Sequence, residues 1–321
     1  MTMDPDLVPP RGRRYAGPMA TPIELREGDE ALAVVYPELG GWLTRYARRL
    51  PSRGWVDALH HDPAVVARYP DRMWAGSPVL FPHVSYNVAD GKEGQYRLNG
   101  NLYASPQHGF GRRVPWRVVD RSPSAVTMEI SDSEATRPSY PFAFRYALTY
   151  RLAGGRLYWH QRIENRDTQP LPFSAGFHPY LRVPLSGPGR NQCVVRLPRS
   201  RRFHPVDQAG SFFDEPMVAQ DLPVSIDASG TLFLGDLGAR ELSLRDTAGG
   251  VAVTLNFDTH PAYRFLALWA PDPASAFFCI EPWTALPNSF GRADGEVTVL
   301  PPGADFEASL WMDLSEIPPG A

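Results

Sequence analysis

Cysteine is scarce in this sequence, and its scarcity limits the available chemistry. The 321 residues include two cysteines, Cys193 and Cys279. Two cysteines allow one disulfide but no disulfide framework, and they exclude a metal site built from cysteine ligands. Cys279 lies within an apolar run, where a cysteine is typically a small buried hydrophobic residue. We therefore expect no metal site, no cofactor and no disulfide-stabilised scaffold.

The sequence also lacks an excess of positive charge and a long hydrophobic run. Its formal net charge is −3 at pH 7, and Lys92 is the only lysine. A chain with this charge and scattered arginines gives no indication of nucleic-acid binding. No apolar stretch approaches the roughly 18 residues of a membrane span, and the N-terminus lacks the apolar stretch of a signal peptide. We expect a cytoplasmic protein, monomeric or homodimeric, with neither a nucleic-acid nor a membrane partner.

Proline and glycine, in contrast, are frequent, with 34 and 27 residues. Residues that interrupt regular structure this often indicate many short elements joined by turns. Helical periodicity is correspondingly rare. Its leading candidate runs from Val56 to Tyr69, and Pro63 interrupts it. No internal repeat or interdomain linker is evident, so we expect a flexible leader over residues 1–20, one domain over 21–316 and a tail over 317–321.

Short runs in which polar and apolar residues alternate predict most of the fold. The sharpest signal is Gln95–Leu98 followed by Asn99-Gly100 and Asn101–Tyr103, which is typical of a tight β-hairpin. A second hairpin is predicted where Gly154-Gly155 follows Phe142–Leu152. Further predicted strands are Arg156–Asn165, Leu32–Tyr36, Trp116–Val119, Ala125–Ile130, Cys193–Leu197, Thr231–Leu234, Glu241–Arg245, Val251–Phe257, Arg264–Trp269, Ala276–Ile280 and Phe306–Leu314. Such a series predicts an all-β protein, an antiparallel sandwich or barrel.

Two histidines lie beside glycine or proline and near aromatic residues. His108 is followed by Gly109, and a glycine there permits unusual backbone angles and the close approach of a ligand. His178 precedes Pro179, which favours an extended backbone at the histidine. A bond to a backbone carbonyl explains His108 structurally, and packing in an aromatic edge explains His178 as well. Both residues are candidates for catalysis or binding beside these structural alternatives.

The third candidate is Glu281, which ends the apolar run Phe277–Ile280 and precedes Pro282 and Trp283. Burial without a paired cation raises the pKa of a glutamate, which makes its carboxylate a better base near neutral pH. The structural alternative is an ion pair with one of the many arginines. Because a buried glutamate is uncommon without a reason, we expect Glu281 to have a function.

Other polar and aromatic residues are weaker candidates, and several catalytic templates are absent. Trp74, Trp269 and Trp283 offer flat faces to a sugar ring, although such residues more often belong to a core. Asp258 and His260 are suited either to a sugar hydroxyl or to a turn. The chain contains neither Gly-x-Ser-x-Gly nor a phosphate-binding glycine loop. No metal-ligand spacing with a partner is found for His60, His61 or His204.

In their order and spacing, six segments resemble the aldose 1-epimerase family, and more closely its branch of uncharacterised and hexose-phosphate epimerase-like members. The resemblance covers almost the whole chain. Each motif alone is common, and the combination is fairly specific. The matching segments are Pro37–Gly41, Pro78–Pro82 with its Leu-Phe-Pro sequence, Asn99-Gly100 with Tyr103, His108–Phe110 with Arg112, Gly176–Tyr180 and Glu281–Trp283.

The resemblance implies a large galactose mutarotase-like supersandwich whose concave face binds a sugar. In such a protein Glu281 would take the proton from the anomeric hydroxyl, and His178 would protonate the ring oxygen. His108 would hydrogen-bond the sugar close to that oxygen. The ring would open to the aldehyde, rotate about the C1–C2 bond and close on the other face, with no metal or nucleotide.

The resemblance also implies sugar contacts from Arg112, Tyr180, Trp283 and, more loosely, Asp258. Many family members carry an arginine shortly after the Leu-Phe-Pro segment, whereas this chain has His83–Asn87 there. His83 or Arg112 would then replace the missing arginine. Three hypotheses follow in order: an aldose 1-epimerase acting on a free hexose, a hexose-6-phosphate 1-epimerase, and a carbohydrate-binding protein without turnover.

Overall fold

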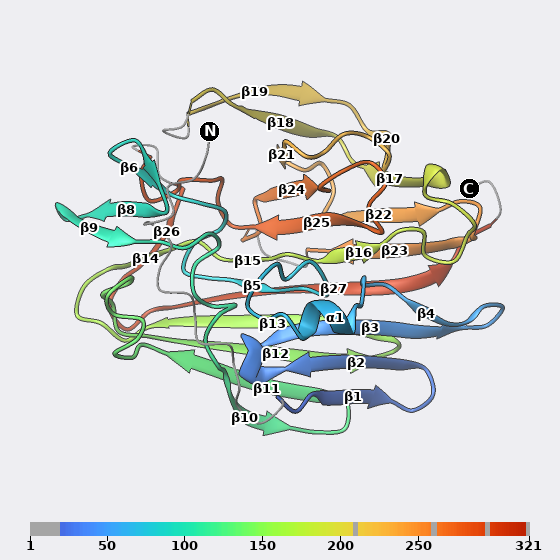
Figure 1. Cartoon of the computed structure of the whole chain (residues 1–321), viewed down its shortest axis with the longest axis horizontal. Coiled ribbons are helices and arrows are strands. Elements are labelled where there is room, and N and C mark those ends of the chain that lie inside the picture. Colours follow the sequence, from blue (N-terminus) through green and yellow to red (C-terminus); the bar gives the residue numbers. More distant parts are fainter. Residues whose placement is uncertain (1–19, 208–210, 258–261, 293–295, 319–321) are drawn as a thin grey trace.

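Antiparallel β-strands dominate the computed structural model, which describes residues 20–207, 211–257, 262–292 and 296–318 (Figure 1). Every pair of neighbouring strands assigned in its sheets is antiparallel. The structure therefore confirms the all-β prediction. Within the described part of the chain, no helix is long and apolar enough to cross a membrane.

The largest sheet contains nine strands among the described residues, and its long central strands cross the whole molecule in Figure 1. Side chains in β12 alternate between buried and half-buried positions, as its sequence pattern predicts. In spatial order the strands are β10 (Arg117–Arg121), β11 (Ala125–Ser131), β12 (Phe144–Ala153), β13 (Arg156–Asn165), β27 (Asp305–Glu316), β23 (Val251–Asn256), β22 (Glu241–Asp246), β17 (Cys193–Leu197) and β20 (Gln220–Pro223).

A second large sheet has eight strands in the described ranges, and among the predicted site residues it carries Tyr180, Glu281 and Trp283. Several of its strands are short because prolines and glycines interrupt them. The main path runs through β19 (Phe212–Met217), β18 (Ser200–Pro205), β21 (Leu232–Gly235), β24 (Phe265–Trp269), β25 (Phe277–Trp283), β15 (Gly176–Phe177) and β5 (Val79–Leu80), and β16 (Tyr180–Arg182) also pairs with β25.

Smaller elements complete the described structure. A four-stranded sheet lies against the nine-stranded sheet, and it consists of β1 (Ile23–Glu27), β2 (Ala31–Tyr36), β3 (Trp42–Leu50) and β4 (Gly54–Asp57). The remaining strands form pairs: β14 (Leu171–Phe173) with β26 (Thr298–Leu300), β6 (Val88–Ala89) with β7 (Lys92–Glu93), and β8 (Gln95–Leu98) with β9 (Asn101–Ala104). The helical segments are α1 (Pro63–Val66) and the 3₁₀ turns η2 (Pro37–Leu39) and η3 (Arg190–Gln192).

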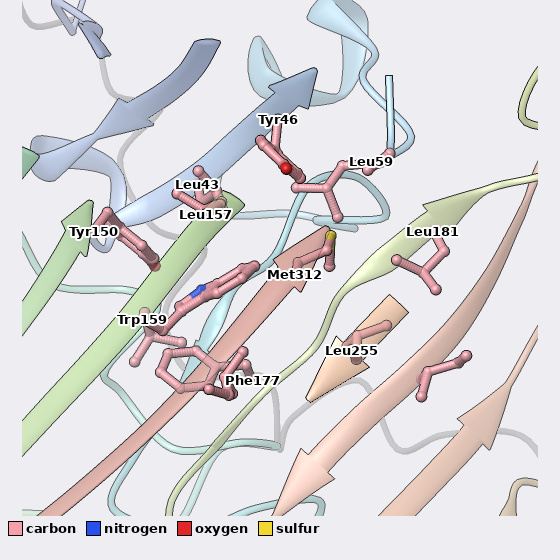
Figure 2. Packing of buried hydrophobic residues seen from close by; sticks show 14 of the residues in the cluster. Leu43, Tyr46, Leu59, Tyr150, Leu157, Trp159, Phe177, Leu181, Leu255 and Met312 are labelled. Atoms are coloured by element: carbon pink, nitrogen blue, oxygen red, sulfur yellow. The ribbon is translucent and has the colours of Figure 1, made fainter. Parts of the chain in front are cut away.

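The main hydrophobic core is built from side chains of all three larger sheets. Figure 2 shows the ring of Trp159 of β13 between Phe177 of β15 and Met312 of β27. The ring centroids of Trp159 and Phe177 are 6.3 Å apart. This core includes residues from β1 to β27, which fits one domain over 21–316. The bounds of that domain, the leader over 1–20 and the tail over 317–321 stay predictions.

The helix predicted over Val56–Tyr69 is wrong for most of its length. Val56 belongs to β4, which pairs with β3, and the helix α1 has four residues. Pro63 begins this helix rather than interrupting it, because a proline at the first helical position loses no intrahelical hydrogen bond. Asp62 caps it by accepting a hydrogen bond from the amide of Ala64 at 2.8 Å.

Candidate active site

The pairing of β16 with β25 brings the predicted residues His178 and Glu281 together. Tyr180 is opposite Cys279 in this antiparallel pair, so residues distant in sequence become neighbours. Phe177 points into the main core against Trp159, as Figure 2 shows. Since neighbouring side chains alternate along an extended segment, His178 points to the opposite face. This face of the eight-stranded sheet carries the candidate site.

The same alternation exposes Glu281 to the site. In β25, Phe278 and Ile280 belong to the main core. Cys279, Glu281 and Trp283 therefore share the opposite face of the sheet. The apolar run that precedes the glutamate is thus explained by one face of the strand packing in the core while its other face lines the site.

His178 and Glu281 form a close, buried pair. The Nε2 atom of His178 lies 3.3 Å from Oε2 of Glu281, and their side chains are 8% and 3% exposed. Oε2 of Glu281 has no hydrogen-bond partner among the described residues, so the contact lacks good hydrogen-bond geometry. A buried carboxylate oxygen without a partner is costly in a resting protein. Its position suits a group that accepts a proton or a hydrogen bond from a ligand.

Burial moves the pKa values of the pair toward each other. It raises the pKa of Glu281 well above its ordinary value, with the Arg112 guanidinium and the Trp283 indole acting in the opposite direction. It lowers the pKa of His178 well below its ordinary value, and the positive charge of Arg112 lowers it further. Both shifts favour the uncharged forms, a protonated Glu281 and an unprotonated His178, and the contact between the two groups allows that single proton to pass between them.

The His108 loop is held by the Leu-Phe-Pro segment. Phe81 donates a backbone hydrogen bond to the carbonyl of His108 at 3.3 Å and accepts one from Gly111 at 2.8 Å. Gly109 has φ +69°, and a Cβ at this position would lie 2.1 Å from the Phe81 carbonyl oxygen. His108 itself has φ +62°, an unfavourable conformation for a non-glycine residue. The glycine after the histidine is therefore required for this close approach of two backbone segments.

The hydrogen bonds of His108 define its tautomer. Its Nδ1 accepts a hydrogen bond from the amide of Ser85 at 3.0 Å. Burial, Arg112 and His178 lower the pKa of His108 well below its ordinary value, so the ring is neutral near neutral pH. The remaining proton is then on Nε2, which makes His108 a hydrogen-bond donor. The rings of His178 and Trp283 lie 5.3 and 5.9 Å from the His108 ring, centroid to centroid.

Arg112 supplies a positive charge beside these three residues. A Cβ at Gly40, with φ +79°, would lie 2.3 Å from the backbone oxygen of Arg112, so the turn after η2 packs directly against this segment. The guanidinium donates from Nη2 to the carbonyl of Gln107 at 3.0 Å, whereas its buried Nε has no partner in the described structure. Burial lowers the pKa of Arg112 to about 10, so it remains charged near neutral pH.

Aromatic side chains border the pair. The ring of Tyr180 stacks on His178 with centroids 4.5 Å apart and an interplanar angle of 6°. Trp269 meets His178 edge-on at 6.1 Å and contacts Trp74 at 5.6 Å. Trp269 and Trp283 thus lie beside the histidines, and Trp74 lies beside Trp269.

His83, one of the predicted sugar contacts, is bonded within the protein interior. His83 is buried, with Nε2 2.5 Å from Oγ of Ser105, and its Nδ1 has no partner among the described residues. The Ser105 hydroxyl therefore holds the ring of His83 in a buried position. Asp258 and His260 lie outside the described residues.

One residue near the pair was not expected from the sequence. The Sγ atom of Cys279, a ring nitrogen of His178 and a carboxylate oxygen of Glu281 all lie within 4.8 Å of one another. Cys279 and Cys193 are both free, so the disulfide that the sequence allowed is not formed. The spacing of Cys279 and Glu281, two residues apart on a strand, was the available signal, because it places both side chains on one face.

Comparison with known proteins identifies a family over most of the chain. The family model described as aldose 1-epimerase matches residues 23–312. The plasmid-encoded protein LacX of Lactococcus lactis subsp. lactis is 24% identical over 292 residues, which cover 83% of this chain and 89% of LacX.

Solved structures share the fold. Slr1438 from Synechocystis sp. PCC 6803 is 23% identical with a TM-score of 0.78, covering 93% of this chain and 97% of its own. A galactose mutarotase related enzyme from Lactobacillus acidophilus is 20% identical with a TM-score of 0.75, covering 93% and 100%. The expected galactose mutarotase-like β-sandwich is therefore confirmed.

Proposed function

Because the chain belongs to the aldose 1-epimerase family, we propose that it interconverts the α and β anomers of a hexose by acid–base ring opening and closure. The observation that carries this proposal is the buried pair of His178 and Glu281, 3.3 Å apart. Anomer exchange requires one group that removes a proton from O1 and another that delivers a proton to O5. A single proton on this pair satisfies both requirements.

The proposed reaction starts once the proton of the pair has moved from Glu281 to His178, which gives a carboxylate on Glu281 and an imidazolium on His178. Glu281 takes the proton of the O1 hydroxyl, C1 and O1 form a carbonyl, and the C1–O5 bond breaks. His178 delivers its proton to O5, which leaves Glu281 protonated and His178 neutral. After rotation about C1–C2, the same transfers run in reverse on the other face of the carbonyl. Positioned proton transfers of this kind contribute about 10²–10⁴-fold to a rate.

The neighbouring residues support these transfers. His108 donates from Nε2 and is suited to hold the ring oxygen before and after protonation. The charge of Arg112 favours the carboxylate form of Glu281, and its free Nε is available to a sugar hydroxyl. Tyr180, Trp269 and Trp283 offer the apolar surface on which a pyranose ring packs.

Polarimetry tests the proposal. Freshly dissolved α-glucose and α-galactose relax toward anomeric equilibrium, and the protein is expected to accelerate at least one of them with saturation. A slightly acidic, dilute buffer keeps the uncatalysed reaction slow. Calorimetric binding of these sugars without any acceleration would instead support the carbohydrate-binding protein without turnover.

A second substrate class is favoured by a specific pocket. Arg182 lies two residues after Tyr180 and so faces the same side of β16. It lines a pocket of about 480 Å³ together with Arg45, His60 and His61. Arg45 is paired there with Asp57 at 2.6 Å. Because burial lowers the pKa of His60 and Asp57 balances Arg45, Arg182 is the residue of this lining best suited to the phosphate group of a hexose 6-phosphate.

Competition separates the two substrate classes. Glucose 6-phosphate should inhibit glucose relaxation, and Arg182→Gln should weaken that inhibition, if the pocket binds the phosphate group. No inhibition at all would leave the free hexose as the substrate, whereas equal inhibition of wild type and Arg182→Gln would refute the role of this pocket.

A further inference from the structure

Three side chains with different metal-ligating atoms converge at the buried pair. A distance of at most 4.8 Å separates any two of three atoms: a ring nitrogen of His178, the Sγ of Cys279 and a carboxylate oxygen of Glu281. All three residues are buried: 6% of the whole surface of His178, 0% of that of Cys279 and 2% of that of Glu281 is exposed. Imidazole, thiolate and carboxylate are the ligand types that Zn²⁺ accepts in proteins.

The spacing of these atoms suits a tetrahedral ion. Nitrogen and oxygen ligands about 2.0–2.1 Å from a tetrahedral Zn²⁺ lie about 3.3–3.4 Å apart. The observed distance from Nε2 of His178 to Oε2 of Glu281 is 3.3 Å. Since zinc–sulfur bonds are about 2.3 Å long, the thiol of Cys279 has to approach the ion by a small side-chain movement.

An independent observation points to a missing partner at this place. Oε2 of Glu281 is buried and has no hydrogen bond among the described residues. Cys279 and Glu281 project from one regular strand, and His178 is held by its backbone hydrogen bond to the carbonyl of Pro78 at 3.1 Å. The three ligands therefore come from backbone segments that the sheet already holds in place. The positive charge of Arg112 repels a divalent cation at this place. The negative charge of a Cys279 thiolate offsets that repulsion, so binding depends most on this ligand.

We propose that His178, Cys279 and Glu281 form a three-ligand site for Zn²⁺ or a similar thiophilic divalent cation, and that the ion inhibits by occupying the place of the anomeric oxygens. The ion is an inhibitor in this proposal and takes no part in turnover. Binding releases two protons to solvent as the three bonds to the ion form, the thiol proton of Cys279 and the proton held by the pair of His178 and Glu281. The inhibition, unlike the binding, rests on the proposed function.

Calorimetry with Zn²⁺ alone, on protein first treated with a chelator, tests the binding. Wild type and the control Cys193→Ser are expected to bind one Zn²⁺ with release of about two protons, from the Cys279 thiol and from the pair of His178 and Glu281. Cys279→Ser should bind at least about 10–100-fold more weakly, because even changes behind a ligand have effects of this size. Co²⁺ gives a second readout, since a thiolate ligand adds a sulfur-to-metal charge-transfer band that Cys279→Ser should lack.

Two outcomes would overturn the site: no binding by wild type, or equal binding by wild type and Cys279→Ser. Cys279→Ala is a second variant, and a thermal unfolding midpoint for each shows that it is folded. Relaxation rates with and without Zn²⁺ then test the inhibition against each variant's own metal-free rate. Zinc binding by a protein without epimerase activity would refute the proposed function alone, whereas unaffected activity at saturating Zn²⁺ would refute the inhibition.

Discussion

The imidazole Nε2 of His178 lies 3.3 Å from the carboxylate Oε2 of Glu281, in a place where both side chains are almost fully buried. Burial raises the pKa of the glutamate and lowers the pKa of the histidine, so neither residue has its ordinary proton affinity. In the proposed mechanism the pair is active with one bound proton. It loses activity when acid adds a second proton or base removes the last one, so a bell-shaped dependence of rate on pH is expected.

The charge of Arg112 should set the position of that pH profile. Its guanidinium lowers the pKa values of His178, His108 and Glu281 alike. Removing it in Arg112→Gln should raise all three and move both limbs of the profile of kcat/KM to higher pH. Measured kcat/KM values across a pH series for both proteins test this shift.

Arg113→Gln is the matched control for that experiment. Arg113 is exposed and follows Arg112 in the sequence. Its charge also lowers the pKa of His108, but less than the charge of Arg112 does. Its replacement should shift the profile less than Arg112→Gln. A shift of equal size in both variants would show that overall charge, rather than the guanidinium within the site, determines the profile.

The turn after His108 should be intolerant of a side chain. Gly109→Ala places a Cβ 2.1 Å from the Phe81 carbonyl oxygen at φ +69°, so the loop has to move. Strain at such a position costs about 1–3 kcal/mol, and the displaced His108 should lower kcat as well. Gly100→Ala is the control, because φ is +80° there but nothing lies within 4 Å of the added carbon. Relaxation rates and thermal unfolding of both variants separate the clash from the backbone strain, and equal losses would contradict the clash.

Local patterns in the sequence predicted the hairpins well. Asn99 and Gly100 have φ +50° and +80°, the left-handed angles that a tight hairpin turn requires, and Gly154 and Gly155 follow the same rule. Arg156–Asn165 is a strand with the predicted bounds. The helix prediction for Val56–Tyr69 was wrong because Pro63 begins the helix instead of interrupting it, and proline is favourable at a helix start.

The site could be predicted residue by residue but not as a geometry. His108, His178 and Glu281 were identified from their neighbours and from the family resemblance. Their contact depends on the pairing of β16 with β25, which joins segments distant in the sequence. Local patterns carry no information on such pairing. For the same reason Cys279 was expected only as a buried residue, although its side chain lies beside the catalytic pair.

His83 should make the protein less stable in acid. Burial lowers its pKa to about 4 from an ordinary value of 6.5. Between these values the unfolded chain binds a proton that the folded protein does not, so the free energy of unfolding falls as the pH decreases. The full window corresponds to about 3 kcal/mol at this residue. Denaturant unfolding at pH 7 and pH 4 should show a smaller loss in His83→Asn than in wild type, and an identical loss in both would contradict the lowered pKa.

The most direct test of the account is the polarimetric relaxation rate of α-glucose and α-galactose with wild type and with Glu281→Gln. The amide keeps the shape of the side chain but does not take the O1 proton. With the sugar that wild type accelerates, Glu281→Gln is expected to be slower by roughly 10²–10⁴-fold, while its thermal unfolding midpoint is not lowered. Wild-type rates in Glu281→Gln would contradict the role of the buried pair and with it the proposed mechanism.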